Sequence, residues 1–193
     1  IASCLVGSEM CIRDRANTME GALSLGVGEP DFPTPEHVRE AAIASIKKGD
    51  TKYTDNRGTV ELRAAAADYL TKFDLHYDKQ DEILITMGAS EGIDLALRTL
   101  VNPGEEVLVA EPSYVSYIPC IELCGGVPVS LKLRAENKFR LTREQLEEKI
   151  TEKSKVLLIS YPNNPTGAIM EKEDLEAIAE VVKEHDLLSL IHI

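Results

Sequence analysis

The chain has 193 residues, of which 44% are hydrophobic and 28% charged, enough to form a core without disulfides or metal. Its 21 basic and 33 acidic residues give a net charge of −12, which argues against general binding to nucleic acid or to anionic membranes. No apolar run approaches the roughly 18 residues of a membrane span. The four irregularly spaced cysteines do not form the framework of a secreted domain, so a cytoplasmic protein is expected.

The two ends of the chain differ from the rest. Residues 1–15 show no helical or strand periodicity, and residues 189–193 read Ser-Leu-Ile-His-Ile. Both segments resemble translated sequencing-adapter sequence. We therefore predict that they are non-native and leave them out of the fold, as one does a fusion scar. The alternative is a genuine N-terminal extension and a genuine final strand.

Between these ends, helix-like and strand-like segments alternate. Thr34 and Pro35 mark the start of a helix that ends near Gly49. Apolar spacing predicts further helices at 60–73, from Gly88 to the turn at 102–104, and at 115–124, 142–150 and 172–185. Short apolar runs predict strands at 83–86, 107–110, 127–133 and 156–160.

This alternation predicts an α/β fold with a largely parallel sheet and helices on both of its faces. In such sheets, ligands bind beyond the carboxyl ends of the strands. Three loops of unusual composition follow predicted strands, so these loops are the candidate site.

The first loop runs from a predicted strand into a predicted helix. Gly88 allows close backbone approach, and Ala89 and Ser90 place free N–H groups and a hydroxyl at the start of the helix. Such a helix start suits a phosphate. The alternative is an ordinary serine cap of the helix.

The second and third loops contain an aromatic ring and an amide. Tyr114, in the loop after 107–110, could lie against a flat ligand, although a simple packing role is the alternative. Asn164 lies in Tyr-Pro-Asn-Asn-Pro-Thr-Gly, where two prolines and a glycine restrict the backbone. A rigid loop that presents one amide is typical of binding sites, and a plain structural turn is the alternative.

Five segments, taken together, resemble the class I/II aminotransferases, the fold-type I enzymes that depend on pyridoxal 5′-phosphate (PLP). They are Leu-Gly-Val-Gly-Glu-Pro-Asp-Phe-Pro-Thr-Pro at 25–35, Lys-Tyr-Thr at 52–54, Met-Gly-Ala-Ser-Glu-Gly at 87–92, Pro-Ser-Tyr-Val-Ser-Tyr at 112–117 and Asn-Asn-Pro-Thr-Gly at 163–167. The resemblance covers 16–188 and implies the N-terminal half of a three-layer αβα PLP-dependent transferase fold. Residues 16–35 would then belong to the small domain and 36–188 to a partial PLP-binding large domain.

The resemblance also implies roles for single residues. Ala89 and Ser90 match the phosphate-binding turn. Tyr114 matches the aromatic residue that stacks on the pyridine ring, and Asn164 matches the asparagine that hydrogen-bonds the phenolic oxygen of the cofactor. Ala89 departs slightly from relatives with glycine or serine there, which matters little for a backbone contact.

Two further matches concern the partner subunit and the substrate. Tyr53 resembles the tyrosine that reaches the phosphate of the neighbouring subunit's cofactor, which implies a homodimer. Gly28 falls where the family's N-terminal segment lines the substrate carboxylate. The family's Schiff-base lysine, its substrate-binding arginine and the carboxylate that protonates the pyridine nitrogen have no match here, so we expect no catalytic residue in this chain and an inactive fragment.

The resemblance favours transfer of an amino group between an amino acid and a 2-oxo acid. Two alternatives stay open: a PLP-dependent carbon–sulfur β-lyase of the same superfamily, and an aminotransferase-like effector domain of a transcriptional regulator. The four histidines share no metal-ligand spacing, so no metal site is expected. Cys120 and Cys124 are expected to be buried free thiols.

Overall fold

The computed structural model describes residues 15–16, 18–21, 28 and 30–193. The chain divides into two compact units, Ile1–Tyr53 and Thr54–Ile193. In the first unit, helix α3 (Glu36–Lys48) begins after Pro35 and ends at Gly49, whose φ of 86° is the left-handed conformation that glycine accepts without strain. The helix predicted after Thr34-Pro35 is thereby confirmed, and none of its residues is buried.

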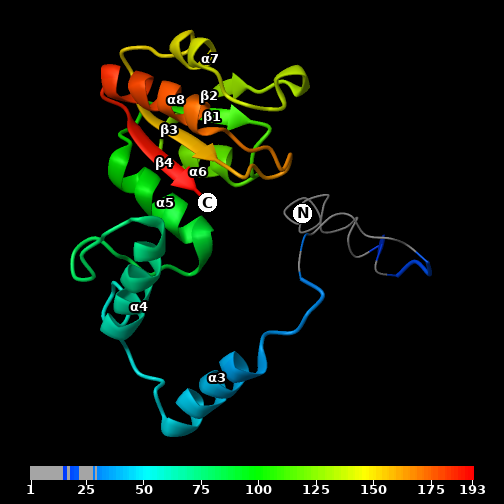
Figure 1. Cartoon of the computed structure of the whole chain (residues 1–193), viewed down its shortest axis with the longest axis vertical. Helices are drawn as coiled ribbons and strands as arrows, with labels where there is room; N and C mark the ends of the chain where they lie inside the picture. Colours follow the sequence, from blue (N-terminus) through cyan, green and yellow to red (C-terminus); the bar gives the residue numbers. More distant parts are fainter. Residues whose placement is uncertain (1–14, 17, 22–27, 29) are drawn as a thin grey trace. The chain divides into compact units, whose positions relative to one another are not determined.

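The second unit contains all of the described strands and every described helix that follows α3 in the chain (Figure 1). Its helices are α4 (Val60–Leu70), η1 (Thr71–Phe73), α5 (Gly88–Leu100), α6 (Tyr117–Leu123), η2 (Ala135–Asn137), α7 (Arg143–Glu147) and α8 (Lys172–Glu184). Its strands are β1 (Glu106–Glu111), β2 (Val127–Lys132), β3 (Ser154–Ser160) and β4 (Leu188–His192).

The four strands form one sheet in the order β2-β1-β3-β4. Every neighbouring pair is parallel, with Leu108 opposite both Val129 and Leu157, and Leu158 opposite Leu190. Because parallel neighbours need crossover connections, a helix separates each strand from the next along the chain: α6, α7 and α8. The predicted α/β class with a parallel sheet is confirmed.

Alternate residues of β1 and β3 enter two separate hydrophobic clusters. Leu108 and Leu157 lie in the cluster that includes Leu146 of α7 and residues of α8. Val107 and Leu158 lie in the other cluster, with residues of α5 and α6. Helices thus cover both faces of the sheet, as the sequence predicted (Figure 1).

Two expectations from the sequence differ from the structure. Residues 83–86, predicted as a buried strand, are not assigned to a strand, and Leu84 is 51% exposed. A strand needs a neighbouring segment that accepts hydrogen bonds from its backbone. Within 83–86, only the N–H of Ile85 donates to a backbone carbonyl of the described residues, that of Arg57 at 3.0 Å.

The second difference concerns the C-terminal end. Residues 189–193 were left out of the fold, whereas Leu188–His192 form β4 beside β3. That both end segments are non-native stays a prediction, and residues 1–14 lie outside the described residues.

Core packing on α5 predicts the cost of two matched substitutions. Leu97 is completely buried and Leu95, on the same helix, is 39% exposed. We expect Leu97→Ala to lower the free energy of unfolding by about 2–5 kcal/mol, because it leaves a cavity. Leu95→Ala, the control, should cost about 1 kcal/mol or less in the same urea titration. Equal costs would contradict this packing.

Candidate functional site

The three candidate loops meet at the carboxyl end of the sheet in the second unit. Strand β1 ends at Glu111, shortly before Tyr114, and β3 ends at Ser160, shortly before Asn164. Helix α5 begins beside them at Gly88, since the hydroxyls of Ser90 and Tyr114 lie 3.5 Å apart. The structure therefore brings the predicted phosphate turn and the predicted stacking tyrosine together.

The start of α5 has the properties of an anion site. Gly88 has a φ of 81°, which favours glycine, and no side chain caps the helix. The N–H of Gly88 donates to the carbonyl of Thr86 at 2.9 Å, and that of Met87 donates to the carboxylate of Glu91. Ala89 and Ser90 are exposed in the first turn, where backbone N–H groups have no partner within the helix. Their N–H groups and the helix dipole favour a bound anion.

Tyr114 is partly buried against the hydrophobic cluster that contains α5 and α6. Its ring meets Tyr117 edge to face, with centroids 5.7 Å apart and an angle of 78°. Hydrogen bonds with Ser116 and Ser90 lower the pKa of the Tyr114 phenol below its usual value. The ring is thus supported on one side by packing and held at its hydroxyl, as a stacking platform requires.

The loop after β3 contains two adjacent asparagines with different surroundings. Asn163 is 6% exposed, and its side-chain amide donates to the carbonyl of Pro112 at 3.0 Å and to the hydroxyl of Thr166 at 2.9 Å. Asn164, the predicted cofactor ligand, is exposed. Asn163 therefore links the loop that carries Asn164 to the loop that carries Tyr114. Sequence reasoning missed Asn163, because the repeated asparagine does not indicate which side chain faces inward.

A second contact missed from the sequence joins β4 to this site. The hydroxyl of Tyr117, which is completely buried, lies 2.7 Å from Nδ1 of His192. Burial raises the pKa of Tyr117. His192 also meets the ring of Tyr114, with centroids 6.2 Å apart. The sequence signal for this contact was the tyrosine pair, Tyr114 and Tyr117. Their partner, His192, lies in residues 189–193, which the sequence analysis left out of the fold.

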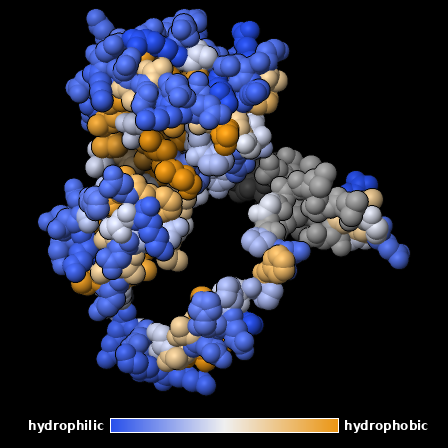
Figure 2. All heavy atoms as spheres, viewed as in Figure 1, coloured by the Kyte–Doolittle hydropathy of each residue, from blue (hydrophilic) through white to orange (hydrophobic). Residues whose placement is uncertain are grey.

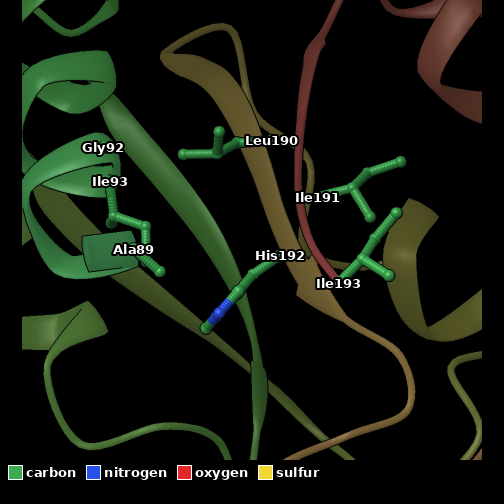
Figure 3. Close-up of a pocket in the computed structure, with 7 residues that line it drawn as sticks. All are labelled: Ala89, Gly92, Ile93, Leu190, Ile191, His192 and Ile193. Atoms are coloured by element: carbon green, nitrogen blue, oxygen red, sulfur yellow. The ribbon is translucent and has the colours of Figure 1, made fainter. Parts of the chain in front are cut away.

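A pocket of about 290 Å³ lies between the start of α5 and the end of β4 (Figure 3). Leu190 and His192 point toward α5, whereas Ile191 and Ile193 point away from it. Ala89 lines the pocket, but Ser90, Tyr114 and Asn164 do not. The pocket therefore adjoins the predicted phosphate turn without containing the whole predicted site.

The other residues singled out from the sequence are described by the unit or element that holds them. Gly28 and Tyr53 belong to the first unit, and both are exposed. Cys120 and Cys124 are free thiols on α6 and its end, and each is only half-buried. The described part of the chain contains no cluster of three metal-ligating side chains. None of the described helices combines the length and the apolar character that crossing a membrane requires.

Comparison with known proteins now gives the family. The sequence model of "Aminotransferase class I and II" matches residues 20–191, most of the chain. The chain belongs to the class I and II aminotransferases.

Relatives of this aminotransferase chain show how much of the family's length it spans. It is 46% identical to aromatic-amino-acid aminotransferase 2 of Thermococcus litoralis, over 92% of this chain and 46% of that protein. It is 43% identical to an aspartate aminotransferase of Pyrococcus abyssi, over 91% of this chain and 45% of that protein. The solved aromatic aminotransferase of Pyrococcus horikoshii is 41% identical, with a TM-score of 0.86 over 93% of this chain and 48% of that one. The chain thus spans about half the length of these relatives, and its parallel sheet is consistent with part of a type I fold.

The two asparagines give a matched test of the loop connection. Asn163→Ala removes the buried amide that donates to the carbonyl of Pro112 and to the hydroxyl of Thr166, so we expect the free energy of unfolding to fall by about 1–3 kcal/mol. Asn164→Ala removes an exposed amide and should change it by about 0.5 kcal/mol or less. Chemical denaturation measures both, and a larger loss for Asn164→Ala would contradict the described loop.

Proposed function

We propose that this chain provides the phosphate-binding and ring-binding half of a PLP-dependent aminotransferase. The observation that carries the proposal is the 3.5 Å approach of Ser90, in the first turn of α5, to Tyr114. One element suits a phosphate and the other suits an aromatic ring, so adjacent groups could hold the two ends of one small molecule.

The residues present fit PLP in three respects. The first turn of α5 offers N–H groups to the phosphate dianion, and the ring of Tyr114 is supported at its edge by Tyr117. The exposed amide of Asn164 is free to donate to the phenolic oxygen, while Asn163 fixes its loop. Glu91 is the one nearby carboxylate in the first turn, and it already accepts the N–H of Met87.

When bound, PLP supplies an electron sink for the carbanion formed at the substrate Cα. The residues of this chain bind and orient it: the α5 turn anchors the phosphate, Tyr114 fixes the ring plane and Asn164 holds the phenolic edge. We place the lysine that moves the proton, the carboxylate at the pyridine nitrogen and the arginine for the substrate carboxylate in the half of the family fold that this chain does not span.

The wider assignments belong to the same proposal. The substrates are an amino acid and a 2-oxo acid, as the aromatic and aspartate aminotransferase names of its relatives suggest. We place Tyr53 at the cofactor phosphate of a second subunit in a cytoplasmic homodimer, and Gly28 at the substrate carboxylate. Residues 16–35 are assigned to the small domain and 36–188 to the large domain.

Comparing PLP with pyridoxal tests the phosphate turn directly. We expect the chain to bind PLP at least tenfold more tightly than pyridoxal, which lacks the phosphate, in an absorbance titration. Ser90→Asp adds a negative charge at the anion site and should abolish this preference without changing pyridoxal affinity. Thr99→Asp adds the same charge near the far end of α5 and should preserve the preference. Equal affinity of the wild-type chain for both compounds would contradict the assignment.

A further inference from the structure

Arg63 on α4 is the only completely buried charged side chain among the described residues. Figure 2 shows that hydrophilic residues cover much of the surface around α4 on the face in view, where a guanidinium would keep its water. Burying a cation costs free energy unless hydrogen bonds replace that water. The burial of Arg63 must therefore be offset by the contacts that its guanidinium makes.

The guanidinium of Arg63 joins two segments that are far apart in the sequence. Its Nε donates to the carbonyl of Gly58 at 3.2 Å. Its Nη1 donates to the carbonyls of Lys79 and Gln80 at 2.6 Å and 3.1 Å. Nη2 is buried without a partner among the described residues. One rigid planar group thus fixes the residues before α4 to the loop at 79–80.

The segment that Arg63 holds is also pressed against Ile85. The carbonyl of Arg57 accepts the N–H of Ile85 at 3.0 Å. Gly58 has a φ of 92°, and a Cβ at this position would lie 2.5 Å from Cγ1 of Ile85. Only glycine allows so close an approach in this conformation. The position of Gly58 therefore fixes the position of Ile85.

The connection from Ile85 to the start of α5 is short and hydrogen-bonded. The hydroxyl of Thr86 donates to the carbonyl of Gly88 at 3.0 Å, and the N–H of Gly88 donates to the carbonyl of Thr86 at 2.9 Å. Ala89 and Ser90 follow directly in the first turn of α5. Their N–H groups therefore take their direction from a segment that Arg63 holds in place through Gly58.

We propose that Arg63 is a positioning residue for phosphate binding at the start of α5. It acts through Gly58 and Ile85 on the direction of the N–H groups of Ala89 and Ser90. Hydrogen bonds weaken when the donor points away from the acceptor, so a displaced turn loses affinity for the phosphate of PLP. The inference rests on the proposed function, which places that phosphate at the start of α5.

The test compares PLP with pyridoxal in absorbance titrations of the whole chain. Arg63→Lys keeps the positive charge but lacks the planar fork that reaches Gly58 and the 79–80 loop together. We expect the preference for PLP, the ratio of the two dissociation constants, to fall at least fivefold. Partial unfolding weakens both compounds by the same factor, so a role in stability alone would leave this ratio unchanged.

A second variant displaces the same contact without altering Arg63. Gly58→Ala places a methyl group against Ile85 and should also lower the preference at least fivefold. The control is Arg98→Lys, because Arg98 is an exposed arginine of α5 whose Nε donates to Asp94 at 2.8 Å. It should change the preference less than twofold.

The outcomes separate this inference from the proposed function. If the wild-type chain prefers PLP but either variant of the Arg63 contact shows a smaller fall, the role of Arg63 is wrong and the phosphate site stands. An equal fall with Arg98→Lys would overturn the role of Arg63 in the same way. Equal affinity of the wild-type chain for both compounds would overturn the two together.

Discussion

Burial of β1 and β3 on both faces is the constraint on which the rest of this structure depends. Alternate side chains in the middle of each strand enter opposite hydrophobic clusters, so polar residues of β1 and β3 stand only at the strand ends. The polar side chains of the candidate site therefore lie in the connections that follow these strands. Because neighbouring strands are parallel, the connections that follow β1 and β3 leave the same edge of the sheet. The position of the candidate site is a consequence of that geometry.

Within the site, contacts between distant parts of the chain fix what each loop presents. Asn163 joins the loop after β3 to Pro112 in the loop after β1, and the Ser90 hydroxyl reaches Tyr114. Neither contact is part of the sheet. A loop held in this way loses little further freedom on binding, so preorganisation adds to affinity. In this account Asn163 is a positioning residue that acts through the backbone of its neighbour.

The sequence predicted the elements whose stability is local or periodic. The strands around 107–110 and 156–160 and the helices at 172–185 and after Pro35 are confirmed to within a few residues, because burial imposes their patterns. Residues 83–86 failed as a strand because strand formation depends on a neighbour that local sequence does not specify. The approach of Ser90 to Tyr114 followed from the topology, but the roles of Asn163 and of the Tyr117–His192 pair depend on side-chain direction, which sequence spacing does not contain.

We infer that the first turn of α5 binds the phosphate of PLP. Its most direct test is amide chemical-shift perturbation by NMR of the isotope-labelled chain, titrated with PLP and separately with pyridoxal. We predict that the backbone N–H signals of Ala89 and Ser90 move with PLP and not with pyridoxal. If these two signals stay unchanged while others saturate with PLP, the phosphate binds elsewhere and the assignment is wrong.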